Sequence, residues 1–306
     1  MGKMLFNDLV DEYLSNIDCN SRSRDTYRRV LNAFKRWIVF EGKDITEIKR
    51  SDILAYKSNL LKNAKAERTI HLYMTVIRRL YEYAEKIGKG ESIASDIHTK
   101  NLHGGFLKEH LTEQEANKLL SSITRDSITG RRNFAIVNLL LRTGMRCVEV
   151  SRLRVCDIIE LSDGSRGVRI QRKGDCARTE TIGVPAKAIE PVLAYIAERN
   201  IEDIREQIFI TRHYKKNIGL TPSAVSRIVK GIMGSAGVYS KTKTAHSLRH
   251  TAFVTMISHG ASIKEVQILA GHKSMATTEI YLKSMDNVLR LKNPASAILD
   301  DVFLIE

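Results

Sequence analysis

The sequence has few cysteines, and none of them is spaced like a metal or redox motif. Cys19, Cys147, Cys156 and Cys176 are scattered along the chain without a C-x-x-C pair. A disulfide-rich scaffold and a zinc knuckle are therefore not indicated, because both need regularly spaced cysteines. We expect reduced thiols that mainly serve packing.

Long apolar runs are also missing. No stretch of about 18 apolar residues occurs, which is the length that a membrane-spanning helix needs. The first residues, MGKMLFNDLVDEYL, mix charged and apolar positions instead of forming the apolar segment of a signal peptide. Phe6 occupies the position where an N-myristoylation signal has Ser or Thr. We expect a cytoplasmic protein that does not associate with a membrane.

Positive charge, by contrast, is abundant. Lysine and arginine number 49 against 35 aspartate and glutamate residues, which gives a net charge of +14 and a pI of about 9.6. Hydrophobic residues make up 43% of the 306 residues, so a shortage of core-forming residues does not explain this charge. The excess indicates a polyanionic partner. The length suits two domains better than one.

Helical periodicity dominates residues 1–87. Apolar residues recur at helical spacing over about residues 6–17, 27–38, 51–61 and 67–87, which predicts a small helical bundle. The opposite helix faces are rich in basic residues. Any one cluster of them is compatible with a solvated helix face, but their density favours contacts with DNA phosphates that position the duplex without reading its sequence. The candidate DNA contacts in this domain are Arg22, Arg24, Arg28, Arg29, Lys65, Arg68 and Arg78.

Residues 88–107 lack this periodicity and are rich in glycine and polar residues, so we expect a linker. A second domain over residues 108–306 follows. Its first helix begins with the capping box of Thr112 and Glu115. Further helices are expected over residues 134–141, 186–198 and 222–234.

A period of two interrupts the helices of the second domain. It predicts strands over residues 155–161, 168–170 and 178–184, with turns at Asp163–Gly164 and Lys173–Gly174–Asp175. The expected fold class is therefore mainly α with a small antiparallel β-sheet.

The stretch 245–282 brings together side chains that suit phosphate chemistry. It holds His246 and Arg249 in H-S-L-R, then Gly271–His272, then Tyr281. We expect a helix from about residue 247 that ends at His259–Gly260, and a second helix over 263–270 that is capped by the box of Ser262 and Glu265 and ended by Gly271. His272 then lies at a sharp corner, and a short helix from about residue 276 carries Tyr281.

Zinc is the other interpretation of clustered histidines, because His246 and His250 are four residues apart. A metalloprotease helix has Glu directly after its first histidine, whereas Ser247 stands here without a nearby third ligand. We therefore expect no metal site.

The order H-x-L-R, G-H and a tyrosine nine residues later resembles the signature of the tyrosine recombinase (phage integrase) family, including its Xer-like site-specific recombinases. The resemblance covers nearly the whole chain. It implies a helical, SAM-like core-binding domain over residues 1–87 and an α/β catalytic domain over residues 108–306. It also implies a first catalytic arginine at Arg146, a supporting acidic residue at Glu149 and a catalytic lysine at Lys173, with Arg172 as the neighbouring alternative.

In such an enzyme each matched residue would have a defined role. Arg146 and Arg249 would bind the two non-bridging phosphate oxygens, and Tyr281 would be the nucleophile that forms a 3′-phosphotyrosine bond. Lys173 would be the general acid. His246 is a candidate base, and His272 would donate a hydrogen bond to the phosphate. No cofactor is implied, because the covalent bond stores the energy for religation.

The implied partner is double-stranded DNA with a specific recombination site. The enzyme would be a monomer in solution and a homotetramer on synapsed DNA, where it would be associated with the nucleoid. Lys241 and Lys243, just before His246, are further candidate DNA contacts. The alternatives are a type IB topoisomerase and a DNA-binding protein with an inactive site.

Two features concern the ends of the chain. Residues 284–306 form an apolar tail that either packs on its own domain or docks on a neighbouring copy. The chain begins almost directly at the expected bundle, which favours a simple recombination site. Integration, excision, dimer resolution and inversion all stay open.

Overall fold

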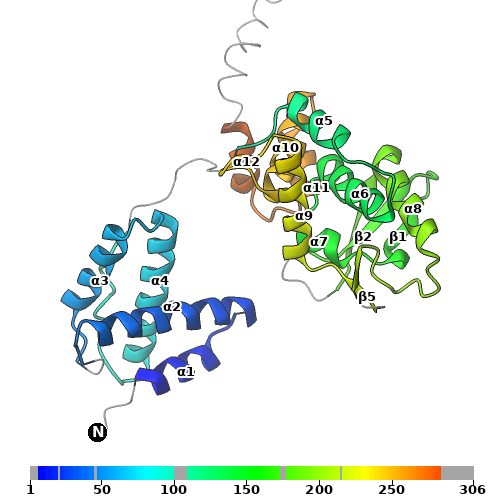
Figure 1. Ribbon diagram of the computed structural model, residues 1–306. Coiled ribbons are helices and arrows are strands. Elements are labelled where there is room, and N and C mark those ends of the chain that lie inside the picture. Colours follow the sequence, from blue (N-terminus) through cyan, green and yellow to red (C-terminus); the bar gives the residue numbers. More distant parts are fainter. Residues whose placement is uncertain are drawn as a thin grey trace, which may run out of the picture. The chain divides into compact units, whose positions relative to one another are not determined.

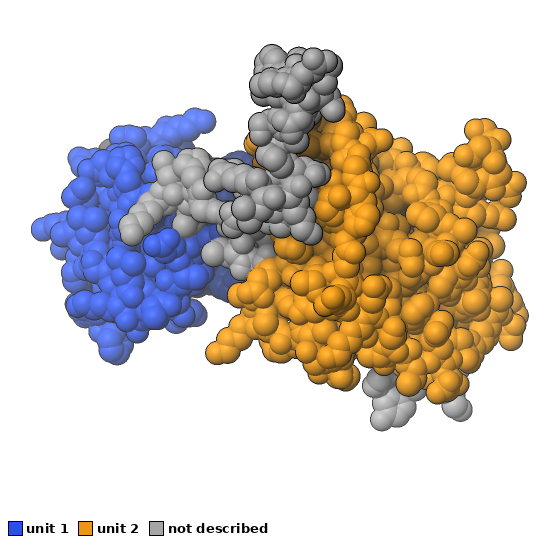
Figure 2. Space-filling view, turned by 90° about the horizontal axis from the view of Figure 1, so that it is seen from above, with its two compact units in different colours: residues 1–103 blue, residues 104–306 orange. Residues whose placement is uncertain are grey.

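A computed structural model gives the fold of the chain. It describes residues 6–19, 21–44, 47–99, 109–172, 177–213 and 216–283. The chain divides into two compact units, residues 1–103 and 104–306 (Figure 2). Over the described ranges the structure is mostly helical with small antiparallel sheets, which confirms the expected class of fold.

The first unit is a helical bundle whose apolar faces meet in one core. Its helices are α1 (Phe6–Asn16), α2 (Ser21–Phe40), α3 (Arg50–Lys62) and α4 (Glu67–Lys86) (Figure 1). Phe34 and Ile38 of α2 and Leu80 of α4 are fully buried, as their helical spacing predicted. The α2 helix begins six residues before the predicted start at residue 27.

The chain after α4 still packs on this bundle. Ala94 and Ile97 are 1% and 4% exposed and belong to the core of the first unit. Arg50 of α3 donates from Nε and Nη2 to the Asp96 carboxylate at 3.0 and 2.8 Å. The first part of the expected linker is thus attached to the first unit, and residues 100–108 lie outside the described ranges.

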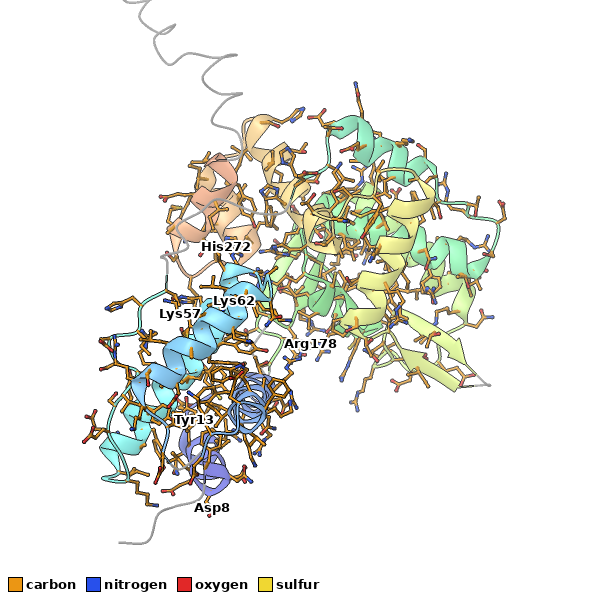
Figure 3. All side chains as sticks on the ribbon, turned by 60° about the vertical axis from the view of Figure 1, so that its left-hand side comes forward. Asp8, Tyr13, Lys57, Lys62, Arg178 and His272 are labelled. Atoms are coloured by element: carbon orange, nitrogen blue, oxygen red, sulfur yellow. The ribbon has the colours of Figure 1, made fainter. Side chains whose placement is uncertain are left out.

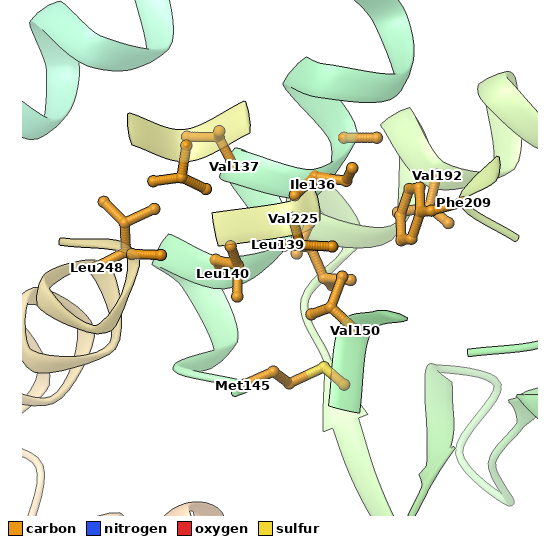
Figure 4. Close-up of a cluster of buried hydrophobic side chains, with 14 of the residues drawn as sticks. Ile136, Val137, Leu139, Leu140, Met145, Val150, Val192, Phe209, Val225 and Leu248 are labelled. Carbon is orange, nitrogen blue, oxygen red and sulfur yellow. The ribbon is translucent and has the colours of Figure 1, made fainter. Parts of the chain in front are cut away.

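The second unit is built around a buried helix. Its helices are α5 (Glu113–Ser121), α6 (Ile128–Thr143), α7 (Cys147–Arg152), α8 (Ala186–Arg199), α9 (Pro222–Ser235), α10 (Ala245–Ser258), α11 (Ile263–Ala270) and α12 (Met275–Lys283). Ile136, Leu139 and Leu140 of α6 lie in the middle of the core (Figure 4). The α6 helix begins before the predicted residue 134, because Ser127 Oγ accepts a hydrogen bond from Gly130 N at 3.1 Å and caps it.

A three-stranded antiparallel sheet flanks the helices. Its strands β1 (Ile158–Glu160), β2 (Arg166–Ile170) and β3 (Glu180–Val184) lie in the order β1-β2-β3. Val168 pairs with Ile158 on one side and with Ile182 on the other. The first strand is shorter than predicted, because residues 155–157 form a 3₁₀ turn, η1 (Val155–Asp157). The predicted turn at residues 173–175 lies outside the described ranges.

A second hairpin was not predicted from the sequence. Its strands β4 (Ile210–His213) and β5 (Lys216–Gly219) pair antiparallel. No helix in the described part of the chain is long and apolar enough to cross a membrane.

Both predicted capping boxes are present. Thr112 Oγ1 accepts from Glu115 N at 3.1 Å, and Ser262 Oγ accepts from Glu265 N at 3.2 Å. In each box the glutamate carboxylate accepts a hydrogen bond from the backbone N–H of the capping residue. The α11 helix begins and ends at the predicted residues.

Candidate active site

Helix α10 runs through the interior of the second unit. All residues from Ser247 to Val254 are buried, and the helix contacts α6, α9, α11 and α12 (Figure 1). It begins at Ala245 and ends at Ser258, and Gly260 has a φ of +96° just beyond it, as expected for a helix stop. A helix that is buried on every side can hold a polar side chain in a fixed position.

Arg249 is the polar side chain that this helix holds. It is 2% exposed, and its Nη1 donates to Gly144 O at 2.6 Å while Nη2 donates to Ala270 O at 2.9 Å. The guanidinium also lies 4.6 Å from the centre of the Phe253 ring. Burial, followed by the nearby charge of Arg146, lowers the pKa of Arg249 to about 10. The group therefore stays positively charged at neutral pH.

The carbonyl oxygen of Gly144 accepts the hydrogen bond from Arg249 Nη1. Gly144 ends α6 with a φ of +64°, a conformation that favours glycine. A Cβ at this position would lie 2.4 Å from the Phe253 ring, so a side chain has no room. The turn leads directly to Arg146, which precedes the first residue of α7.

Arg146 is oriented by Glu149. The carboxylate of Glu149 accepts from Arg146 Nη1 at 2.8 Å through Oε1 and from Arg146 N at 2.8 Å through Oε2. The Glu149 side chain is fully buried, whereas that of Arg146 is 24% exposed. Arg146 Nη1 also lies 3.3 Å from Ala270 O. The predicted pairing of Glu149 with a cationic neighbour is thus present, and part of the Arg146 guanidinium remains reachable.

His272, labelled in Figure 3, lies just after the Gly271 corner. Gly271 ends α11 with a φ of +61°. His272 Nε2 lies 3.1 Å from Arg249 Nη2, and its Nδ1 lies 2.9 Å from Thr278 Oγ1. Because a guanidinium only donates, Nε2 accepts here, and we assign the ring proton to Nδ1, which donates to Thr278. Burial, followed by the charges of Arg249 and Arg146, lowers the pKa of His272 to about 4, so the ring is neutral at pH 7.

Tyr281 of α12 closes the site and is 3% exposed. Its ring stacks on His272 with centroids 6.0 Å apart and meets Phe253 edge-on at 5.2 Å. Burial raises the pKa of Tyr281, while the charge of Arg249 and a hydrogen bond with that residue, followed by the charge of Arg146, oppose the rise. The hydroxyl that would act as nucleophile therefore lies beside the candidate phosphate-binding arginines.

The structure brings together four of the six residues that the sequence matched. These are Arg146, Arg249, His272 and Tyr281. His246 is exposed on the first turn of α10, one helical turn from Arg249, and its charge contributes to the lowered pKa values of His250 and His272. Lys173 lies outside the described residues.

Two groups at the site were not assigned from the sequence. Arg172, which was only the alternative to Lys173, is buried at the same corner as His272. His250 is also buried, and its ring lies 5.2 Å from those of both Tyr281 and His110. Burial, followed by the charges of His110 and His246, lowers the pKa of His250 to about 4. Beyond its place beside Lys173, no sequence signal marks Arg172, because Leu269 and Ala270, two of its partners, are distant in the chain.

The candidate DNA contacts of the first unit have different surroundings. Arg29, Lys65 and Arg68 are exposed, and Arg24 is half-buried. Arg28 pairs with Asp11 at 2.5 Å, and Arg78 Nε lies 3.8 Å from the Glu82 carboxylate. The side chain of Arg22 lies outside the described residues.

Lys241 and Lys243 also differ. Lys241 is exposed, whereas the Lys243 side chain is 11% exposed and its Nζ lies 2.5 Å from Glu115 Oε1. Glu115 belongs to the capping box of α5, so Lys243 attaches the loop before α10 to that helix. A DNA phosphate would have to compete with this ion pair.

The described residues hold no group of three or more His, Cys, Asp or Glu side chains placed to bind a metal ion. Within the described residues, the cations of the site are guanidinium groups. Arg146, Arg172 and Arg249 share it with the carboxylates of Glu149 and Glu180. The arrangement has an excess of positive charge and suits a phosphate group.

Comparison with known proteins agrees with the family that the sequence motifs resemble. Residues 109–287 match the phage integrase family, and residues 10–88 match the phage integrase N-terminal SAM-like domain. The fold, the clustered residues and these matches place the chain in the phage integrase family.

The similarity to individual relatives extends over most of the chain. The tyrosine recombinase XerA of Pyrococcus furiosus is 27% identical, covering 92% of this chain and 91% of its own. The tyrosine recombinase XerD of Listeria monocytogenes is 27% identical, covering 90% and 93%. A solved structure of XerH bound to its difH substrate after cleavage shares the fold, with a TM-score of 0.73, 22% identity and coverage of 96% and 85%.

Proposed function

We propose that the protein is a site-specific DNA recombinase that cuts and rejoins strands through a 3′-phosphotyrosine intermediate. The observation that carries the proposal is that buried Tyr281 and Arg249 meet half-buried His272 in one cluster, with Arg146 beside them. The family supports the same activity, because the relatives are named tyrosine recombinases. Nothing in these names favours the topoisomerase alternative.

The two arginines are suited to hold the scissile phosphate. Arg146 has a partly exposed guanidinium that is oriented by Glu149, and Arg249 is fixed by the carbonyls of Gly144 and Ala270. Donors that are already in place stabilise the charge that develops on the non-bridging oxygens without rearrangement during the reaction.

Strand cleavage would proceed by in-line displacement. Tyr281 Oη would form a bond to phosphorus while the bond from phosphorus to the 5′ oxygen breaks. The phenol proton would pass to a base, for which exposed His246 is our candidate, and the leaving 5′ oxygen would take a proton from Lys173. Attack by the 5′ hydroxyl of another strand would reverse these steps and release Tyr281.

His272 would change partners when DNA binds. In this structure its Nε2 accepts from Arg249 and offers no proton. A phosphate that draws the Arg249 N–H groups to itself would free Nε2, and its negative charge would raise the pKa of the imidazole. The ring could then donate to a phosphate oxygen, which is the role that we propose for it.

The partner would be double-stranded DNA carrying a specific site. The exposed cations of the first unit would neutralise backbone phosphates. Strand exchange between two duplexes needs four nucleophiles, so we propose a tetramer on DNA that forms from monomers, in association with the nucleoid. A solved relative, lambda integrase, has been captured as a tetramer on a Holliday junction.

Covalent capture tests the proposal without knowledge of the site. The protein is incubated with a pool of random-sequence duplexes, each with a nick close to the candidate cleavage positions, so that a short 5′-hydroxyl fragment diffuses away after cleavage. Adducts that survive denaturation are amplified and sequenced. We expect enrichment of one site and a nucleotide remnant on the peptide that contains Tyr281, found by mass spectrometry.

The matched variants are Tyr281→Phe and Tyr239→Phe. Tyr239 is 43% exposed in the same unit and lies outside the candidate site. Tyr281→Phe should bind the selected DNA and form no adduct, whereas Tyr239→Phe should react like the wild type. An adduct formed by Tyr281→Phe would exclude the proposed nucleophile. Selected DNA that is bound and never cleaved by the wild type would favour a DNA-binding protein with an inactive site.

A further inference from the structure

Arg172 lies two residues after the end of β2, and its side chain is buried. It is 6% exposed, although a basic residue in a hairpin usually points into solvent. Its Nε donates to Glu180 Oε2 at 2.7 Å, and Nη2 donates to Leu269 O at 3.0 Å. Nη1 lies 3.4 Å from Ala270 O and 3.5 Å from Glu149 Oε1. One guanidinium therefore joins β3, the end of α11 and α7.

These acceptors explain why the charge can be buried. A guanidinium that leaves water needs hydrogen-bond acceptors and a compensating charge. Glu149 is fully buried beside it, while Glu180 is 45% exposed and contributes less because water screens it. The carbonyls of Leu269 and Ala270 end α11, where the helix dipole also favours a cation.

The guanidinium of Arg172 leaves no room for a side chain at Gly271. A Cβ at residue 271 would lie 2.5 Å from Arg172 Nε and 2.6 Å from Cζ. The backbone of the corner therefore rests directly on the guanidinium, and His272 is the next residue. The identity of residue 271 and the position of Arg172 depend on each other.

Arg172 also shares its acceptors with the two arginines of the candidate phosphate site. Ala270 O accepts from Arg249 Nη2 at 2.9 Å and lies 3.3 Å from Arg146 Nη1. Glu149 Oε1 accepts from Arg146 Nη1 at 2.8 Å. A movement of Ala270 would therefore change the direction of both candidate phosphate-binding groups, and a movement of Glu149 would change that of Arg146.

We propose that Arg172 is a positioning residue for strand cleavage, which holds the Gly271–His272 corner, the Ala270 carbonyl and Glu149 in the arrangement that Arg146, Arg249 and His272 need. This role rests on the proposed function. We do not place Arg172 among the catalytic residues, because the arginines that act on the Tyr281 hydroxyl are Arg249 and Arg146 and a guanidinium cannot supply a proton near neutral pH. It acts through the geometry of its neighbours.

Single-turnover cleavage separates positioning from simple stabilisation. Arg172→Lys is compared with Arg166→Lys, which keeps the same charge at an exposed residue of β2 that pairs with Glu160. A lysine at residue 172 cannot bond all four acceptors, since it lacks the planar fork. The cleavage rate constant at saturating protein should fall by roughly 10- to 100-fold in Arg172→Lys. The Kd for the selected DNA should stay within about threefold of the wild type, since lysine keeps the positive charge at residue 172. Arg166→Lys should match the wild type in both.

Two results would overturn the proposal. One is a wild-type rate constant in Arg172→Lys. The other is a lower yield of adduct with an unchanged rate constant and a lower melting temperature, which would mean that the residue only stabilises the fold.

A double-mutant cycle with Gly271 provides a second test that does not need catalysis. Gly271→Ala should be destabilised, because the new Cβ collides with Arg172 and because the residue has a positive φ. Arg172→Ala removes the collision and leaves only the backbone strain, so the two changes should be clearly less than additive in thermal unfolding. Additive losses would show that the two residues do not act through their contact.

These readouts also distinguish failure of the inference from failure of the proposed function. If the wild type formed no adduct on any DNA, the proposed function would fail, and so would the role of Arg172 in cleavage. The double-mutant cycle would still report on the contact between Gly271 and Arg172. If the Arg172 variants did not fold, Gly271→Ala alone would supply the kinetic test. Gly271→Ala retains the Arg172 guanidinium but displaces it from its position. A wild-type cleavage rate constant in this variant would therefore overturn the proposal.

Discussion

The ion-paired arginines on the surface of the first unit contrast with the buried arginines of the second unit. In the first unit, the side chains of Arg28 and Arg50 are 49% and 50% exposed, and each forms an ion pair with an exposed aspartate. In the second, Arg249 and Arg172 are 2% and 6% exposed and bind carbonyl oxygens of distant segments. Exposed charges are screened and replaceable. A buried guanidinium is held in one geometry by its acceptors. Its substitution should therefore have a larger effect than that of an exposed arginine.

The largest expected effect is that of Arg249→Ala on cleavage. Removing one preorganised donor to a developing oxyanion costs about 2.7–4 kcal/mol in other enzymes, or 10²- to 10³-fold in rate. We expect a loss of this size in adduct formation at saturating DNA. Arg29→Ala, at an exposed position of the first unit, should leave the single-turnover rate constant unchanged. Equal effects of the two substitutions would remove the distinction between the units.

A smaller effect is expected for Glu149→Gln. The amide keeps the size of the side chain but loses the charge that faces Arg146 and Arg172. A hydrogen bond to a charged group contributes about 1.5–3 kcal/mol, so denaturant unfolding should show a loss of stability in this range. Glu82→Gln is the control, because Glu82 pairs with Arg78 on the surface of the first unit. A control that loses as much stability would contradict the comparison.

Acid should destabilise the second unit through its histidines. The pKa values of His250 and His272 are lowered to about 4, against about 6.5 for an unfolded chain. Between these values the unfolded state binds more protons, so the free energy of unfolding falls as the pH drops from about 6.5 to about 4. His250→Gln removes one of the two groups and should flatten the dependence of the melting temperature on pH. Parallel curves for variant and wild type would disprove the contribution of His250.

The smallest effects are expected from single cations of the first unit. Replacing Lys65 or Arg68 by Gln should weaken DNA binding slightly. If the residue contacts one phosphate, the slope of log K against log salt should decrease by about 0.9. Lys187→Gln, at an exposed position of α8, controls for the general change in charge. An unchanged slope after all three first-unit cations Arg29, Lys65 and Arg68 are replaced would exclude this surface as the DNA contact.

The comparison also explains which features could be predicted from the sequence. Helices follow local periodicity and local caps, so the boxes at Thr112 and Ser262 and the corner at Gly271 could be placed correctly. The motif residues of the second unit could be selected because their order and spacing match a family. The cations of the first unit carry no such pattern, and their exposure depends on neighbours.

What could not be predicted depends on contacts between distant segments. Arg172 and Lys243 look like surface residues, yet one binds the end of α11 and the other binds Glu115, 128 residues away. The β4–β5 hairpin was missed because its sequence, ITRHYKKNIG, has few apolar residues in alternation. For Arg172 and Lys243 the deciding interaction is set by the tertiary fold, whereas the two strands of the hairpin are neighbours in the chain.

The burial of α10 has a consequence for the synthesis of the chain. The first unit is complete once residues 1–103 have been made, and a domain generally folds as a unit while translation continues. The second unit is different, because α6 and α9 pack on α10, which comes more than a hundred residues after the start of α6. Until residues 245–258 leave the ribosome, the apolar surface that α10 covers has no partner. The nascent second unit should therefore need protection from aggregation at the stage when the first is already folded.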